Sequence, residues 1–291
     1  MDSPLVSFII INYNTKKLTN DCVSSLLKHH KSISYEIIVV DNGSTDGSVE
    51  YLSASFPNII IISNGKNLGF GFGNNIGVDK SKGKYIILLN SDTIVLKNIV
   101  TPFIDFYTTH KNLNIGVLGY LLISEDSDVL HSFGKFPYLM RLRLGSFVKM
   151  KQSFVISNIE KNYFSEVDII SGALMFMETT IFNRFQGFDT NIFLYEEELE
   201  LQYRMKLKGF ISIIINEKGV VHLEGKSSLS YFKRKCSFLS LCYIMKKHFP
   251  FYQYVLFRLK WNIYAMIFFK NSKISLKEKI DYLLLTFKKI N

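Results

Sequence analysis

Residues 84–93 read KYIILLNSDT, and the fold prediction starts from this stretch. The unbroken apolar run YIILL at residues 85–89 has the length of a strand, and it predicts a parallel strand that is buried on both faces. The polar residues Asn90, Ser91 and Asp92 follow at once. Ligands of open α/β sheets bind outside the carboxyl ends of the strands, so we expect the Asp92 carboxylate to lie in a ligand crevice.

Three earlier apolar runs predict further strands, at residues 5–11, 36–40 and 59–62. Helical spacing of apolar residues predicts helices between them, at residues 15–30 and 49–56. Strands that alternate with helices indicate an α/β fold with a mostly parallel central sheet and right-handed crossovers. Because the carboxyl ends of parallel strands share one edge, we expect polar strand-end residues to gather there, namely Asn12, Tyr13, Asn14 and Asp41.

The glycine-rich segment NLGFGFGNNIG at residues 67–77 does not match the GxGxxG pattern of dinucleotide-binding folds. Asn74 stands at the third glycine when the count starts at Gly69, and the segment does not follow the first strand, where that pattern belongs. We therefore expect no nicotinamide cofactor. The glycines are interpreted as sites of close packing and of backbone approach to a ligand, at the start of a helix that runs toward Lys82.

The second half of the chain continues the pattern with a helix at residues 98–107 and a strand at residues 115–123. Residues 124–165 show no clear period and predict loops and antiparallel strands. Residues 166–177 then predict one strand with a bend at Gly172.

An acidic cluster lies near the start of a helix predicted at residues 193–208, which Gly209 ends. Acidic residues at the start and basic residues at the end fit the helix dipole without any function. That rule does not account for three consecutive glutamates at residues 196–198, whose mutual repulsion is expected to raise at least one pKa toward the range useful for proton transfer. A strand at residues 211–215 and then His222 follow.

The charge of the chain is concentrated at its C-terminal end. The formal net charge is +10, but residues 229–291 hold thirteen Lys or Arg and two acidic residues, so the first 228 residues carry a net charge of −1. This distribution indicates a separate partner for the basic tail and argues against nucleic-acid binding by the whole surface. The three cysteines show no CxxC spacing, so we expect no disulfide framework or zinc site and a reducing, cytoplasmic setting. The first predicted strand begins at residue 5 with no basic and apolar leader before it, so we expect no signal peptide.

The basic tail contains the apolar stretch 249–269, which has the length of a membrane-spanning helix. Arg258 and Lys260 lie near its centre, where charge is costly, so a spanning helix is not favoured. Basic residues interleaved with aromatic residues such as Trp261 predict amphipathic helices that lie on an anionic membrane surface. The alternative is a helical cap that packs on the rest of the chain and exposes a solvated basic face.

Taken in order, the motifs resemble the family 2 glycosyltransferases, and especially the bacterial rhamnosyltransferase-like members that build surface polysaccharides. The resemblance covers residues 6–228 and implies the nucleotide-sugar-binding GT-A fold. The resemblance implies a catalytic domain at residues 1–228, followed by the tail at 229–291. Within this domain, residues 1–123 form the nucleotide-sugar-binding half and residues 124–228 form the acceptor and catalytic half. The motifs are IIINYN, VVDNGSTDGS, NLGFGFGNN, LLNSDT, SGALMFM, GFD, FLYEEELELQYR, VVH and KSS.

The resemblance also assigns roles to single residues. Asp41 is expected to bind the nucleotide base, and Asp92 of the DxD-like segment 90–92 is expected to bind a Mg²⁺ or Mn²⁺ ion that bridges the donor diphosphate. His222 matches a histidine that approaches this metal, and Glu198, preceded by Glu197, falls at the catalytic base. The implied nucleotide-sugar-binding residues are Asn12, Tyr13, Asn14, Asp41, Gly69, Asn74, Asn90, Ser91 and Asp92.

Several alternatives remain open from the sequence. Glu198 is one methylene longer than the expected Asp, so Glu197 or Glu200 could be the base instead. Asn90 stands where the strictest DxD motif has an acid, and asparagines 74 and 75 stand where many relatives have an Arg, so diphosphate contacts could come from Lys66. The aspartates at 41 and 46 also fit an ordinary turn, and His222 also fits a structural histidine.

The resemblance and the residue types imply an inverting glycosyltransferase. It would move a sugar from a UDP- or dTDP-linked donor to a lipid-linked oligosaccharide or glycan acceptor in bacterial capsule, O-antigen or exopolysaccharide synthesis. We expect it to be cytoplasmic and peripheral at the inner face of the cell membrane. A non-catalytic sugar-nucleotide scaffold and a sugar-phosphate nucleotidyltransferase are the two alternatives.

Overall fold

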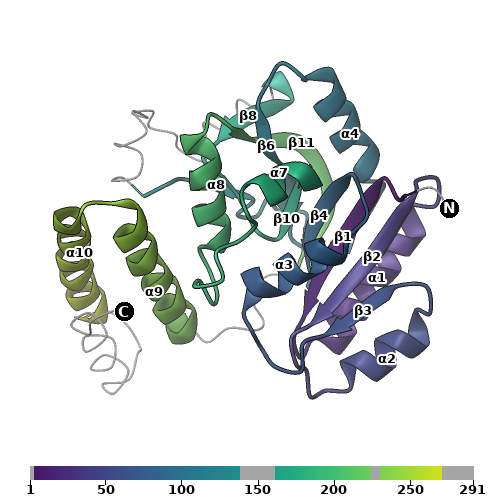
Figure 1. Ribbon diagram of the computed structural model, residues 1–291, viewed down its shortest axis with the longest axis horizontal. Helices are drawn as coiled ribbons and strands as arrows, with labels where there is room; N and C mark the ends of the chain where they lie inside the picture. Colours follow the sequence, from purple (N-terminus) through teal and green to yellow (C-terminus); the bar gives the residue numbers. More distant parts are fainter. Residues whose placement is uncertain (1–2, 138–160, 224–229, 271–291) are drawn as a thin grey trace. The chain divides into compact units, whose positions relative to one another are not determined.

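The structure is a computed structural model that describes residues 3–137, 161–223 and 230–270 (Figure 1). It divides the chain into two compact units. The first contains Met1–Thr190 and Glu198–Glu224, and the second contains Asn191–Glu197 and Gly225–Asn291. The domain boundary predicted at residue 228 lies outside the described residues.

The first unit is built on one mixed sheet with the strand order β3-β2-β1-β4-β10-β6-β11-β5, in which β8 also pairs with β11. The first four strands in this order are parallel, β10 runs antiparallel between β4 and β6, and β11 is parallel to β6. The strands are β1 (Val6–Asn12), β2 (Tyr35–Asp41), β3 (Ile60–Ser63), β4 (Tyr85–Asn90), β5 (Thr93–Val95), β6 (Ile115–Ile123), β8 (Phe164–Val167), β10 (Leu174–Glu178) and β11 (Ile211–His222). The predicted mostly parallel sheet is therefore confirmed.

Two strand predictions were wrong in their extent. The single strand expected at residues 166–177 is broken into β8, β9 (Ile169–Ile170) and β10. The break occurs at Asp168, whose Oδ2 accepts a hydrogen bond from the Phe136 amide, and at the turn after β9. The strand expected at 211–215 instead continues to His222, through an irregularity between Ile215 and Val220.

The segment expected to form loops and antiparallel strands is described in part. Within it, β7 (Phe133–Gly134) pairs antiparallel with β9, and β8 pairs antiparallel with β11. Residues 138–160 lie outside the described residues.

Helices cover both faces of the sheet (Figure 1). Alternation along β1 sends Phe8 and Ile10 into one core and Ile9 and Ile11 into the other. Side chains of α1, α2 and α4 complete the first core, and side chains of α3, α7 and α8 complete the second. These helices are α1 (Lys16–His29), α2 (Ser48–Ser55), α3 (Phe70–Lys80), α4 (Val100–Thr109), α7 (Thr179–Arg184) and α8 (Glu197–Leu207).

The close-packing part of the glycine interpretation is confirmed at α3, and the approach to a ligand stays a prediction. A Cβ atom on Gly77 would lie 2.4 Å from Ile9 Cγ2, so only glycine lets this helix lie so close to β1. A Cβ atom on Gly73 would lie 3.2 Å from the Asn42 side chain, which is a tight contact but less severe than that at Gly77. The close approach brings the N-terminus of α3 to the carboxyl edge of the strands.

The start of helix α8 differs from the prediction. Residues 193–196 are not helical, because Tyr195 and Glu196 have positive φ angles of 66° and 72°. The predicted end is confirmed, since Gly209 follows the helix with a φ of 81°. The first helical residue is therefore Glu197.

The second unit contains the helices α9 (Ser230–His248) and α10 (Phe251–Lys270). The two helices pack on each other, and the rings of Phe238 and Trp261 lie 5.3 Å apart. Within the described ranges, no helix combines the length and apolar character that crossing a bilayer requires.

Candidate active site

Strand register gathers the predicted polar residues at one edge. Asn12 is the register partner of Asp41 on β2, and its neighbour Ile11 is the register partner of Asn90 on β4. All three polar residues end parallel strands, so they share the carboxyl edge of the sheet, where open α/β folds bind ligands.

Asn12 and Asp41 form a buried hydrogen-bonded pair at this edge. Asn12 Nδ2 donates to Asp41 Oδ1 at 2.6 Å and to Ser44 Oγ at 2.9 Å. Asp41 Oδ2 accepts from the amides of Gly43 and Ser44, and the residue is only 2% exposed. Asp41 therefore stabilises the turn that follows β2, as the alternative interpretation of this residue expected. Three of about four lone-pair directions of the carboxylate are already used.

Threonine hydroxyls tie this pair to the loop after β4. Thr15 and Thr19 both donate to Asn12 Oδ1, at 2.9 Å and 2.7 Å, and Thr15 Oγ1 lies 3.2 Å from Ser91 Oγ. Thr15 occupies the N-cap position of α1 but does not cap it with its side chain. The sequence did not identify this link between the first strand and residues 90–92.

Asp46 takes over the role of helix cap. Its Oδ2 accepts from the Lys16 amide at 3.0 Å, and its Oδ1 accepts from the amide and hydroxyl of Ser48. Burial acts to raise the pKa of Asp46, but these hydrogen bonds outweigh it and hold the pKa below its ordinary value.

Tyr13 and Asn14 form the outer part of the same edge. The Asn14 backbone is left-handed, with a φ of 53°, and its side chain accepts a hydrogen bond from the Thr45 amide at 2.8 Å. Tyr13 is 47% exposed, so its ring presents an aromatic surface beside the strand ends.

The glycine-rich segment lies against the Asp41 turn. Gly69 has a φ of 95°, and its carbonyl accepts from Asn42 Nδ2 at 3.0 Å. Asn74 is buried, and its amide donates to Phe70 O within helix α3. The exposed Lys66 is adjacent too, since a Cβ on Gly43 would lie 2.5 Å from Lys66 Cα.

Asp92 and His222 meet across two antiparallel strands. β5 pairs with the end of β11 so that Thr93 is the register partner of His222, and the Leu223 amide donates to Asp92 O at 2.9 Å. His222 Nε2 lies 3.2 Å from Asp92 Oδ1. Residues 130 positions apart in the sequence are thus brought together as the resemblance implied.

Two buried polar atoms of this cluster have no hydrogen-bond partner within the part of the chain that the structure describes. They are Asn90 Oδ1 and His222 Nδ1. An unsatisfied buried acceptor or donor costs about 1–3 kcal/mol, so such groups in a folded protein call for an explanation such as a bound ion or ligand.

The donor set fits a divalent cation that is shared with a substrate. Adjacent ligands of an octahedral Mg²⁺ or Mn²⁺ ion lie about 3 Å apart, close to the 3.2 Å between Asp92 Oδ1 and His222 Nε2. Among the described residues there is no group of three or more His, Cys, Asp or Glu side chains that could hold an ion alone. One or two protein ligands completed by substrate phosphates is the usual arrangement for Mg²⁺.

The structure separates the glutamates of helix α8. Glu200 is fully buried, and Arg204 Nε donates to both of its carboxylate oxygens, at 3.0 Å and 2.8 Å. Arg204 also donates to the carbonyls of Phe185 and Gly187. Glu197 is 4% exposed. Glu200 thus links helix α8, through Arg204, to the turn at residues 185–187. This structural contact argues against the alternative that Glu200 is the base.

Glu198 is partly exposed and lies next to the turn between β9 and β10. Its carboxyl carbon is 3.8 Å from the position that a Cβ atom on Gly172 would take. The following residue, Ala173, accepts a hydrogen bond from the Asn90 amide at 3.1 Å. Glu198 and Asn90 therefore flank the same turn.

The pKa of Glu196 is raised, but not for the expected reason. Burial raises it, and the Ser237 hydrogen bond and the Lys233 charge act in the opposite direction. The explanation by repulsion among consecutive glutamates is therefore wrong for Glu196.

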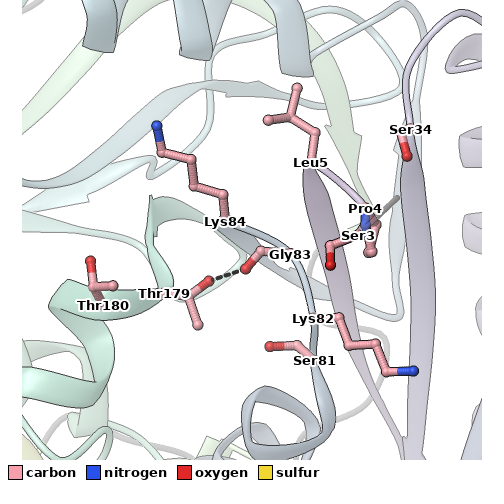
Figure 2. A pocket seen from close by; sticks show the side chains of 10 residues that line it. All are labelled: Ser3, Pro4, Leu5, Ser34, Ser81, Lys82, Gly83, Lys84, Thr179 and Thr180. Carbon is pink, nitrogen blue, oxygen red and sulfur yellow. Dashed lines mark hydrogen bonds between the residues drawn. The ribbon is translucent and has the colours of Figure 1, made fainter. Parts of the chain in front are cut away.

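A separate cavity of about 560 Å³ lies at the opposite edge of the sheet (Figure 2). Leu5, Ser34 and Lys84, which line it, directly precede β1, β2 and β4. It is therefore at the amino ends of the parallel strands and is not the site described above.

Comparisons with known proteins identify the family and the fold. The model of Glycosyl transferase family 2 matches residues 7–165, more than half of the chain. The chain belongs to this family. The match confirms the resemblance that the motifs carried.

Two curated relatives are rhamnosyltransferases. The N-acetylglucosaminyl-diphospho-decaprenol L-rhamnosyltransferase of Mycobacterium tuberculosis is 25% identical over 209 residues, which cover 66% of this chain and 67% of the relative. The rhamnosyltransferase WbbL of Escherichia coli is 25% identical over 243 residues, which cover 79% of this chain and 88% of the relative.

A solved structure supports the fold. The mannosyltransferase PcManGT from Pyrobaculum calidifontis, in complex with GDP-Man and Mn²⁺, superposes with a TM-score of 0.58 at 15% identity. The superposition covers 85% of this chain and 64% of that chain, so this glycosyltransferase spans less than two thirds of its structural neighbour. The predicted GT-A fold is confirmed.

Proposed function

We propose that this chain is an inverting, metal-dependent glycosyltransferase of bacterial surface-polysaccharide synthesis. It transfers a sugar from a UDP- or dTDP-linked donor to a lipid-linked or glycan acceptor. The name of the mycobacterial relative, which includes a diphospho-decaprenol acceptor, supports the lipid-linked acceptor, and both rhamnosyltransferase relatives support a deoxysugar donor class.

The observation that carries the proposal is the cluster of Asp92, His222 and Asn90 at the carboxyl edge. Asp92 and His222 would hold a Mg²⁺ or Mn²⁺ ion, and the unsatisfied Asn90 Oδ1 would contribute to its surroundings. The ion, when bound, neutralises the charge that develops on the leaving diphosphate. The Mn²⁺ in the mannosyltransferase complex supports a divalent cation in this fold.

Nucleotide binding is assigned to the network at the ends of β1 and β2. Asn12 and Asp41 are buried and hydrogen-bonded, so they hold the shape of the turn on which the nucleotide rests. Tyr13 is exposed, and its ring can stack on the base. The Asn74 amide is used inside α3, so its proposed role is to hold the glycine-rich segment and not to contact the diphosphate.

Glu198 is the proposed catalytic base. An acceptor hydroxyl must lose its proton while it attacks the anomeric carbon, and a carboxylate within reach can accept that proton. Glu198 is partly exposed beside Gly172, whereas Glu197 is buried and Glu200 is held by Arg204. Attack on the face opposite the leaving diphosphate in one displacement inverts the anomeric configuration.

We infer that the second unit binds an anionic membrane surface, where a lipid-linked acceptor resides. The N-terminal half of α10 exposes large apolar side chains, and the basic residues Arg258 and Lys260 lie near them in the sequence. Exposed aromatic and aliphatic residues beside basic ones are typical of helices that lie at a membrane interface. The apolar residues are Phe251, Tyr252, Leu256 and Leu259.

The test is nucleoside diphosphate release from a panel of UDP-, dTDP- and GDP-sugars, with a bacterial membrane lipid extract as acceptor source. Release from one donor, lost with EDTA and restored by Mn²⁺, is the expected result. Glu198→Gln should abolish release and retain donor binding, whereas Glu50→Gln on the exposed side of α2 is the matched control.

Three results would contradict the proposal. Normal turnover by Glu198→Gln would refute the base assignment. Donor binding without release from any donor and acceptor combination would favour the scaffold. Formation of a nucleotide-sugar from a sugar phosphate and a nucleoside triphosphate would favour the nucleotidyltransferase.

A further inference from the structure

Residues 191–197 form the backbone that leads directly into helix α8. In the structure these seven residues belong to the second unit, together with α9 and α10, although the sequence on both sides of them belongs to the first. Glu198, the proposed base, follows them immediately. Whatever holds this segment therefore also influences the start of α8.

Helix α9 holds the segment through one of its faces. Ser237 Oγ donates to Glu196 Oε1, and Ser240 Oγ donates to Leu194 O at 3.2 Å. Two further contacts are a hydrogen bond from Asn191 Nδ2 to Tyr243 Oη at 3.2 Å and the Lys233 ammonium 5.4 Å from the Tyr195 ring centroid. The α9 residues recur at intervals of four, three and three, which places them on one side of a helix.

The segment needs such support because its backbone is strained. Tyr195 and Glu196 are two consecutive non-glycine residues in the left-handed region, with φ angles of 66° and 72°. L-residues rarely adopt this conformation, and it persists only where surrounding contacts impose it. A change of φ at Glu196 would redirect the next two side chains, including that of Glu198.

We propose that α9 is a positioning element for the transfer reaction, in which Ser237 fixes the left-handed Glu196 and so orients the base at the start of α8. This inference rests on the proposed function. It gives the C-terminal helices a role in catalysis in addition to membrane binding. Ser237 and Glu196 are positioning residues, because neither is assigned a contact with the substrate.

The test is steady-state kinetics of Ser237→Ala. We expect kcat to fall about tenfold, which corresponds to about 1.4 kcal/mol of activation free energy, with the donor KM unchanged. Ser237→Thr keeps the hydroxyl and should recover most of the lost rate. Glu196→Gln keeps an acceptor for Ser237 and should lose less than Ser237→Ala. Ser53→Ala, at an exposed position of α2, is the matched control.

A second measurement separates this inference from the proposed function. Hydrogen exchange of the amides in residues 191–198 should become faster in Ser237→Ala whether or not the protein has been shown to transfer a sugar. Unchanged exchange would overturn the inference, and so would an equal loss of rate in Ser237→Thr. Abolished turnover in Glu196→Gln alone would also overturn it, because Glu196 would then be the base. An inactive wild-type chain with faster exchange in Ser237→Ala would refute only the proposed function.

Discussion

Replacing Glu200 of helix α8 should affect stability, whereas replacing Glu198 should affect the rate of transfer, although the two residues are chemically identical and lie two positions apart. Glu200 is fully buried and receives both of its Arg204 Nε contacts within 3.0 Å. Glu198 is partly exposed beside Gly172. We therefore expect Glu200→Gln to lower stability and Glu198→Gln to lower kcat.

The size of the stability effect follows from the Arg204 contacts. Arg204 donates four hydrogen bonds, two to Glu200 and one each to the carbonyls of Phe185 and Gly187. Removing one partner of a buried pair costs about 3–5 kcal/mol. The Arg204 side chain is 20% exposed, so water partly compensates it and the expected loss is about 3 kcal/mol.

Thermal unfolding provides the assay. A loss of about 3 kcal/mol lowers the midpoint by about 6–12 °C in a domain of this size. Glu198→Gln should leave the midpoint within about 2 °C, since substitutions away from buried networks change stability by about 0.5 kcal/mol. A Glu200→Gln variant with wild-type stability, or a Glu198→Gln variant that is destabilised and still fully active, would refute this division of roles.

Three further predictions concern other parts of the chain. Gly77→Ala should lower the free energy of unfolding by about 1–2 kcal/mol in urea titration, because the clash with the stiff Ile9 side chain outweighs the gain in helix propensity; an unchanged or higher stability would contradict it. Asp46→Asn should lower the free energy of unfolding at pH 7, because the hydrogen bonds that lower the pKa of Asp46 stabilise its ionised form in the folded protein. The difference from wild type should disappear as the pH falls through the lowered pKa and the carboxylate is protonated. A difference that persists at acidic pH would refute that linkage. Leu256→Glu on α10 should weaken binding to anionic vesicles at low salt while leaving the thermal midpoint unchanged, and undiminished binding would exclude this face as the membrane surface.

Local signals were sufficient to predict most of the first half of the fold. The strand expected at residues 115–123 matches β6, and those at 5–11 and 36–40 match β1 and β2 within one residue at each end. These strands are buried on both faces, so a continuous apolar run identifies them without tertiary information. The run at 166–177 was misleading because it supplies three separate strands. β8 pairs with β11, β9 pairs with β7, and β10 pairs with β4 and β6.

The sequence was sufficient to predict which residues gather at the candidate site, but not which of them contact one another. Strand ends indicated Asn12, Asp41 and Asn90, and the structure places them at one edge. The link through Thr15 to Ser91 was not predictable, because a threonine before a helix reads as an ordinary cap. Only the pairing of distant segments shows that its hydroxyl joins two strand ends.

Helical geometry explains why the sequence left the catalytic base undecided. Glu198 and Glu200 are about 200° apart around an α-helix, so only one of them can face the carboxyl edge of the sheet. The sequence shows that the two glutamates face different sides of the helix, but it does not show which of them faces the carboxyl edge. That depends on which glutamate Arg204 binds. Arg204 is fixed by the carbonyls of Phe185 and Gly187, which lie some twenty residues earlier in the chain. Once the arginine occupies that turn, Glu200 faces it and Glu198, about 200° away, lies on another side of the helix. This ion pair is the reason why we propose Glu198, and not Glu200, as the base.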